Sequence, residues 1–171
     1  MMIRLFRCAT MLFALCALWS GAAAQVSMQV EVSGAVQRTL RLDATELATS
    51  EAQQIVTFVQ TRSTQGVETK STVRGVKLSA LIERAGLVAK GRDGWKTLVI
   101  VATATDGYRA VFAWPEVTNT AGGDGVLLLF ERDGKPLDER EGRIALMSTA
   151  DRNLGARYVR NLARIEVRPL D

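Results

Sequence analysis

The chain alternates short apolar segments with polar turns, a pattern typical of strands joined by hairpins. Apolar side chains occupy every second position from Val26 to Val32, and residues 98–104 form an apolar, β-branched run. The pairs Asp106-Gly107 and Asp133-Gly134 predict tight turns. We predict strands at residues 26–32, 40–42, 55–59, 98–104, 108–114, 126–130, 144–147 and 162–167.

Three segments carry helix signals instead. Asp43, followed by Glu46 three positions later, has the spacing of a capping box and predicts a helix at 43–48. Apolar residues at helical spacing predict a second helix, Leu78–Ala85, which would end at Gly86. Pro115 suits the first turn of a short helix at 115–118. The stretch 61–72 is polar and predicts a turn at Gly66, and 121–125 predicts a glycine-rich loop.

Many strands with few short helices, joined by hairpins rather than long crossovers, predict an α+β fold built on a mixed β-sheet. The apolar positions of these elements supply the predicted core. Its members are Leu81, Ile82, Val99, Val101, Val111, Leu127, Leu129, Leu146 and Ile165.

The first 24 residues predict a secretory signal peptide. Arg4 and Arg7 form a basic head, an apolar run follows, and the segment ends in three alanines at 22–24. The apolar run is shorter than the roughly 20 residues that a membrane-spanning helix needs. We therefore expect cleavage after Ala24, a single domain at 25–171, a periplasmic or secreted location and no stable membrane insertion.

Composition excludes several kinds of chemistry. The chain has no histidine, and its two cysteines, Cys8 and Cys16, both lie in the predicted signal. A mature chain from residue 25 would have no thiolate or imidazole ligand, which excludes disulfides, the usual zinc and haem ligand sets and Ser-His-Asp catalysis. The sequence therefore predicts no metal site.

The charge pattern favours a small anionic ligand over nucleic acid. The chain has 22 basic and 18 acidic residues, and no dense basic run is interleaved with aromatic residues. Arginines are nevertheless frequent from Arg140 onward. They are either a solvated surface or a site for carboxylate-like or phosphate-like groups, which the guanidinium fork matches.

Four segments resemble, in order, the oxidoreductase molybdopterin-binding domain of sulfite oxidases and their bacterial relatives. They are GVKLSALIERAG at 75–86, ATDGYRA at 104–110, RDGKPL at 132–137 followed by Gly142, and YVRNLARIEV at 158–167. The resemblance implies a sulfite-oxidase-like α+β fold, a molybdopterin cofactor and oxidoreductase activity.

The chain departs from the family pattern at the metal ligand. In catalytic relatives a cysteine thiolate binds molybdenum in a loop shortly before the segment that matches Gly75. The corresponding stretch here, 60–66, offers Thr61, Arg62 and Ser63 but no sulfur. An alcohol is a hard ligand that stays protonated near neutral pH, so it does not replace a soft thiolate. We therefore expect no cofactor.

Three hypotheses about function remain open. The first is a cofactor-free binding module that uses the old cofactor groove for a small anionic ligand. The second is a molybdopterin-dependent oxidoreductase whose metal has no cysteine ligand. The third is a periplasmic partner of a redox or sensory protein, with contacts at Trp95 and the loop 120–125. No catalytic residue is assigned. The groove candidates are Thr61, Arg62, Ser63, Asp106, Tyr108, Arg109 and Arg152.

Overall fold

The computed structural model describes residues 25–170 except 52–53, 65–66 and 154. The predicted signal peptide and the predicted turn at Gly66 lie outside the described residues. Its strands are β1 (Gln29–Gly34), β2 (Leu40–Asp43), β3 (Ile55–Thr64), β4 (Val67–Lys77), β5 (Leu98–Ala104), β6 (Arg109–Ala113), β7 (Val126–Arg132), β8 (Lys135–Pro136), β9 (Ala145–Ser148) and β10 (Leu162–Pro169). Its helices are α1 (Ala44–Ala48), α2 (Leu78–Ala85) and α3 (Trp114–Asn119), with short 3-10 turns η2 (Gly94–Thr97) and η3 (Gly123–Gly125).

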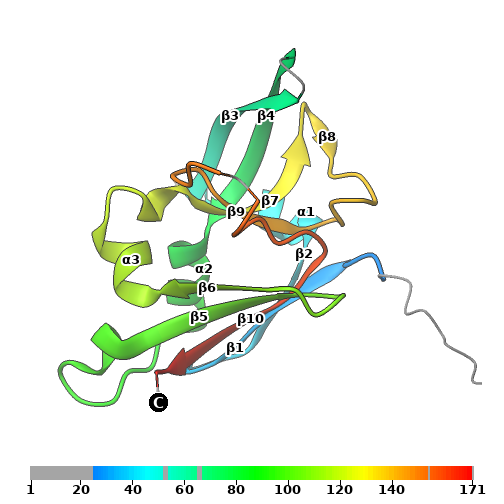
Figure 1. The fold of residues 1–171 in the computed structure, drawn as a ribbon. Coiled ribbons are helices and arrows are strands. Elements are labelled where there is room, and N and C mark those ends of the chain that lie inside the picture. The colour runs from blue at the N-terminus through cyan, green and yellow to red at the C-terminus, as the bar shows by residue number, and fades with distance from the viewer. Residues whose placement is uncertain (1–24, 52–53, 65–66, 154, 171) are drawn as a thin grey trace, which may run out of the picture.

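The strands form two sheets of an α+β fold (Figure 1). The first sheet has the order β2-β1-β10-β5-β6, and the second has the order β3-β4-β7-β8 with β9 also paired to β7. The β1–β10 pair is parallel and the β1–β2 pair antiparallel, so the first sheet is mixed, as predicted. Figure 1 shows the β3–β4 hairpin projecting at the top, away from the first sheet.

The main core takes buried side chains from both sheets and from all three α-helices. The α2 residues Leu78, Leu81, Ile82 and Ala85 are all buried, which confirms the predicted apolar stripe. A second, smaller cluster occupies the other face of the second sheet. Its buried members are Val73, Leu127, Leu129, Leu137, Ala145 and Met147. No helix of the described chain is long and apolar enough to cross a membrane.

The local signals at helix ends and turns are confirmed. Asp43 accepts a hydrogen bond from the Glu46 N–H at 2.8 Å, and Glu46 accepts one from the Asp43 N–H at 2.8 Å, which completes the capping box. Gly86 ends α2 with a φ of 78°, in the left-handed region that glycine adopts readily. Gly75 lies on β4, where a Cβ atom would meet the Leu128 carbonyl oxygen at 2.6 Å.

Two predicted core residues, Val111 and Val99, are not in the core, and neither is Met28, an alternating position of the first predicted strand. Val111 is 54% exposed because it lies on the edge strand β6 with its side chain opposite to the buried Ala110 and Phe112. Val99 is also only partly buried. It pairs with Ala113, which lies two residues from Val111 on β6, so Val99 is on the same outer face of the first sheet as Val111. Met28, in the alternating stretch before β1, is 62% exposed.

Several predicted boundaries also change. The predicted strand at 55–59 continues to Thr64 and pairs with β4, so most of the polar stretch 61–72 is hairpin rather than loop. Cross-strand hydrogen bonds do not require apolar side chains, which is why hydropathy missed this extension. Trp114 begins α3 instead of ending β6. The first predicted strand begins only at Gln29, and the predicted loop 121–125 contains η3, with Gly123 buried beneath α3.

Candidate functional site

Arg132, the last residue of β7, is the centre of a hydrogen-bonded network. Its Nε and one terminal nitrogen donate to both carboxylate oxygens of Glu141, at 3.0 and 2.8 Å. The other terminal nitrogen donates to Gln60 Oε1 on β3 at 2.8 Å and to Ser71 Oγ on β4 at 2.6 Å. The Tyr158 hydroxyl accepts from Arg132 at 3.2 Å and donates to Glu141 at 2.5 Å. We call these five side chains the Arg132 network.

The network is a partly buried electrostatic unit, in which the Arg132 and Glu141 side chains are 22% and 13% exposed. Burial lowers the pKa of Arg132, but its hydrogen bonds and charge attraction to Glu141 outweigh burial and raise that pKa above its ordinary value. Burial and the hydrogen bond to Glu141 raise the pKa of the Tyr158 hydroxyl. Arg132 therefore stays charged, and Tyr158 stays protonated, throughout the neutral pH range.

Gln60 is the most deeply buried member of the network, at 2% exposure. Its Oε1 accepts from Arg132, but its Nε2 has no hydrogen-bond partner among the described residues. An unpaired buried amide N–H costs about 1–3 kcal/mol. The hydrogen bond from Arg132 to Oε1 nevertheless joins this buried residue of β3 to the end of β7.

A pocket of about 190 Å³ lies beside the network, between the β5–β6 turn and the segment before β10. Tyr108 and Tyr158 both line it, and each hydroxyl is bonded outside the pocket: Tyr108 donates to the Ala156 carbonyl at 2.7 Å. Asp106 accepts from the Tyr108 N–H at 2.9 Å, which holds the turn. Arg160 is exposed and has no ion-pair or hydrogen-bond partner among the described residues. We call this space the Arg160 pocket.

Arg157 holds the segment before β10, which forms one wall of the Arg160 pocket, against the rest of the protein. Its Nε donates to Asp151 at 3.0 Å, a terminal nitrogen donates to Glu116 of α3 at 2.6 Å, and a second ion-pair contact joins it to Asp151. The guanidinium also stacks over the Phe112 ring, 4.7 Å from its centroid. These contacts hold Arg157, the residue before Tyr158, against α3 and β6.

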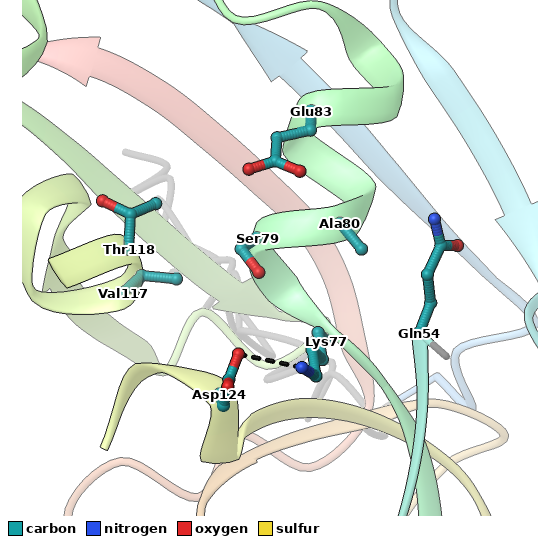
Figure 2. A pocket seen from close by; sticks show the side chains of 8 residues that line it. All are labelled: Gln54, Lys77, Ser79, Ala80, Glu83, Val117, Thr118 and Asp124. Carbon is teal, nitrogen blue, oxygen red and sulfur yellow. Dashed lines mark hydrogen bonds and ion pairs between the residues drawn. The ribbon is translucent and has the colours of Figure 1, made fainter. Parts of the chain in front are cut away.

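Two other polar pockets differ from the Arg160 pocket in the charges of their lining residues. A pocket of about 330 Å³ lies between α2 and α3 (Figure 2). Its Lys77 is paired with Asp124 at 2.9 Å, and Glu83 adds a further negative charge. A pocket of about 380 Å³ next to Ser71 carries three carboxylates, and the one arginine among its described lining residues is Arg132, which belongs to the network. Among the lining residues that the structure describes, neither pocket offers a cation free to bind an anion.

Comparisons with known proteins identify the family. A family model for the oxidoreductase molybdopterin binding domain matches residues 17–170. The chain belongs to this family. Among solved structures, the chain is similar to the sulfane dehydrogenase SoxCD from Paracoccus pantotrophus, with a TM-score of 0.61 and 18% identity. The match covers 81% of this chain but only 37% of the SoxCD chain, and at this identity it shows the fold alone. A search of curated proteins found no match.

The side chains of this family member do not fit a thiolate-bound metal. The chain from residue 25 onward has neither cysteine nor histidine, and Cys8 and Cys16 lie outside the described residues. The described residues contain no group of three or more acidic, cysteine or histidine side chains placed to hold a metal ion. At the start of the stretch 60–66, which the resemblance matched to the ligand loop, the structure has the buried amide of Gln60 on a regular strand.

The structure brings together only part of the predicted groove. Asp106 and Tyr108 line the Arg160 pocket, whereas Thr61 lies exposed on β3 in the other sheet. Arg62 and Ser63 also lie on β3, and their side chains are outside the described set. Arg109 and Arg152 are exposed and line none of the pockets described above.

Residue-by-residue reasoning missed four members of the site: Gln60, Arg132, Tyr158 and Arg160. A signal was present, since the last three lie in the segments that carry the family resemblance, 132–137 and 158–167. Nothing local marked Gln60, Arg132 and Tyr158 as partly or fully buried.

Proposed function

We propose that this chain is an exported, cofactor-free member of its family that binds a small carboxylate in the Arg160 pocket. The observation that carries the proposal is a guanidinium with no described partner at the edge of a pocket walled by two tyrosine rings. Guanidinium matches a carboxylate by two parallel hydrogen bonds. The pocket volume of about 190 Å³ is below the ~300–1,000 Å³ of drug-sized sites, so the ligand is small.

Asp106 narrows the ligand class further. Its carboxylate lines the same pocket as Arg160, and only one of its oxygens accepts the Tyr108 N–H. A simple dianion would be repelled by this charge. A ligand that matches both Arg160 and Asp106 is a carboxylate that also carries an ammonium or hydroxyl donor, such as an amino acid or a hydroxy acid. The tyrosine rings would pack against its carbon atoms.

A thermal-shift screen of the exported protein with amino acids, hydroxy acids and simple carboxylates tests this proposal. A ligand present at about 100 times its Kd stabilises the fold by about 2.7 kcal/mol. We expect a shift with at least one bifunctional carboxylate, and we expect Arg160→Gln to abolish it. Arg164→Gln is the matched control, because Arg164 is an exposed arginine on β10 that does not line the pocket.

Two results would refute the proposal. One is the absence of any shift across the screen, or a shift that Arg160→Gln leaves unchanged. The other concerns the cofactor: protein isolated from its native compartment is analysed for molybdenum and for pterin fluorescence. We expect neither, and about one molybdenum per chain would favour the oxidoreductase hypothesis instead.

A further inference from the structure

A pocket of about 560 Å³ lies at the end of the first sheet where β5 begins and β10 ends. Leu98 and Pro169 pair across these two strands, and both line the pocket. In Figure 1 this end of the sheet is at the lower left, and the β3–β4 hairpin is at the top. We call this space the Lys90 pocket, after a lysine that lines it.

The Lys90 pocket is separate from the Arg160 pocket. The Arg160 pocket lies where β5 ends and β10 is about to begin, at the opposite end of the same strand pair. The seven residues of β5 rise about 3.3 Å each, so the two pockets lie about 20 Å apart along the sheet. A ligand in one pocket does not occupy the other.

The walls of the Lys90 pocket are mainly apolar. Ala35, Val88, Leu98 and Pro169 contribute apolar side chains, and Gly94 contributes none. The volume lies within the ~300–1,000 Å³ of small-molecule sites, which are mostly apolar with a few polar groups that orient the ligand. Volume and lining therefore both fit a small organic molecule.

Backbone hydrogen bonds between distant segments hold these walls in place. The Ala35 N–H donates to the Val167 carbonyl at 2.7 Å, and the Val88 N–H donates to the Ala35 carbonyl at 2.9 Å. The Leu170 N–H donates to the Thr97 carbonyl at 2.8 Å. These bonds join the end of β1, the loop after α2, η2 and the end of β10, so the fold itself sets the shape of the pocket.

The charge of the pocket is also distinctive. Lys90 is the one charged side chain among its described lining residues, whereas each of the three pockets described above is lined by at least one carboxylate. Lys90 is exposed and has no ion-pair or hydrogen-bond partner in the described part of the chain. The hydroxyl of Thr97, the other polar side chain described in the lining, donates to the Gly94 carbonyl at 3.2 Å. An apolar hollow with one unpaired ammonium is complementary to an apolar body that carries one negative charge.

We propose that the Lys90 pocket binds a free organic acid with an apolar body, such as a medium-chain fatty acid or an aromatic acid. The apolar body packs against Val88, Leu98 and Pro169, and the carboxylate pairs with the Lys90 ammonium. This ligand is larger than the bifunctional carboxylate of the Arg160 pocket and needs no second polar group. The inference goes beyond the proposed function and does not depend on it.

Fluorescence titration of the exported protein with anilinonaphthalene sulfonate tests the pocket, because this probe combines an apolar aromatic body with one anionic group. We expect one saturable site per chain. Octanoate should displace the probe, whereas acetate, which has the charge without the apolar chain, should not. Absence of saturable binding of both the probe and octanoate, or equal displacement by acetate, would overturn the proposal.

A charged residue in the apolar wall tests where the probe binds. Val88→Asp places a carboxylate in the wall at a residue that is already 44% exposed, and it should weaken binding of the probe at least tenfold. Val59→Asp is the matched control, because Val59 is 56% exposed on β3 and does not line the pocket. Equal binding in wild type and Val88→Asp, or an equal loss in Val59→Asp, would overturn the proposal.

Neutralising Lys90 tests the charge of the ligand, and it does so even if Val88→Asp does not fold. Lys90→Gln should weaken anilinonaphthalene sulfonate about three- to fivefold, the size expected for an exposed ion pair, and leave binding of the neutral N-phenylnaphthylamine unchanged. Arg92→Gln is the control, because Arg92 is exposed in the same loop but does not line the pocket. Equal effects of the two substitutions on the anionic probe would overturn the assignment of an acid.

Sedimentation of the wild-type protein tests a different occupant, a second copy of the chain. We expect a monomer. A dimer that Val88→Asp dissociates would show that a second copy covers the pocket and would overturn the proposal. The screen at the Arg160 pocket measures a different class of ligand, so either proposal can fail without the other.

Discussion

Asp151 is the residue whose charge state links the fold most directly to pH. The hydrogen bond from Arg157 lowers the pKa of its carboxyl below the ordinary value of 3.8, against the opposing effect of burial, and Ser148 contributes in the same direction. A carboxyl whose pKa is lower in the folded than in the unfolded state stabilises the fold above its unfolded pKa. That stabilisation is lost as the pH falls through the folded pKa.

We therefore expect the free energy of unfolding to fall below about pH 4, and Asp151→Asn to weaken this dependence. Urea unfolding between neutral pH and about pH 2 measures it. Asp93→Asn is the control, since Asp93 forms an exposed pair with Lys96, and surface pairs contribute about 0–1 kcal/mol. Equal pH slopes in wild type and Asp151→Asn would show that the Arg157 clamp does not contribute.

At the scale of single elements, β4 lies close to β7 because Gly75 has no side chain. A Cβ atom at Gly75 would lie 2.6 Å from the Leu128 carbonyl oxygen, which belongs to the paired strand and has little freedom to move. The bulge between Arg74 and Gly75 shows that the strands already adjust at this point. Glycine is thus required here for packing.

Gly75→Ala is expected to destabilise the protein by about 1–3 kcal/mol through overpacking. Chemical denaturation gives the value. The matched variant Gly155→Ala adds the same methyl group where nothing lies within 4 Å of the new Cβ, so it should change stability by no more than about 0.5 kcal/mol. Backbone entropy alone would make both substitutions slightly stabilising. Similar losses in both variants would therefore show that the contact with Leu128 does not decide the effect.

The helix α2 and the edge strand β6 provide a second contrast between elements. Leu81 is 1% exposed in the main core, so Leu81→Ala should cost about 2–5 kcal/mol. Val111 has a similar hydropathy but is 54% exposed, and Val111→Ala should cost less than about 1 kcal/mol. Denaturant midpoints of the two variants, measured under the same conditions, test this difference. Comparable losses of stability in both variants would contradict the assignment of faces on β6.

At the scale of the whole molecule, the prediction concerns where the mature chain starts. The first strand begins at Gln29, four residues after the predicted mature terminus Gln25. Mass spectrometry of protein from outside the cytoplasm should find Gln25 as the first residue. The same protein should react with no thiol reagent, because both cysteines would have left with the signal. An intact Met1 on a cytoplasmic protein would contradict export.

The sequence by itself determined the features that depend on near neighbours. The Asp43–Glu46 capping box, the left-handed Gly86 and the Asp133-Gly134 turn each involve residues within a few positions, and all are present in the structure. The fold class followed from the order of such local signals, and the family from the resemblance of four segments. Chain connectivity holds these partners together, so their interactions are encoded by spacing alone.

Only the tertiary structure decided which side chains are covered and which polar groups meet. Val111 alternates like a core residue, but within the described part of the chain it is 54% exposed on its face of β6. Gln60 and Arg132 look like ordinary surface residues, but pairing of β4 with both β3 and β7 brings them within 2.8 Å of each other. Contacts across such separations depend on sheet order and register, which no short stretch of sequence contains.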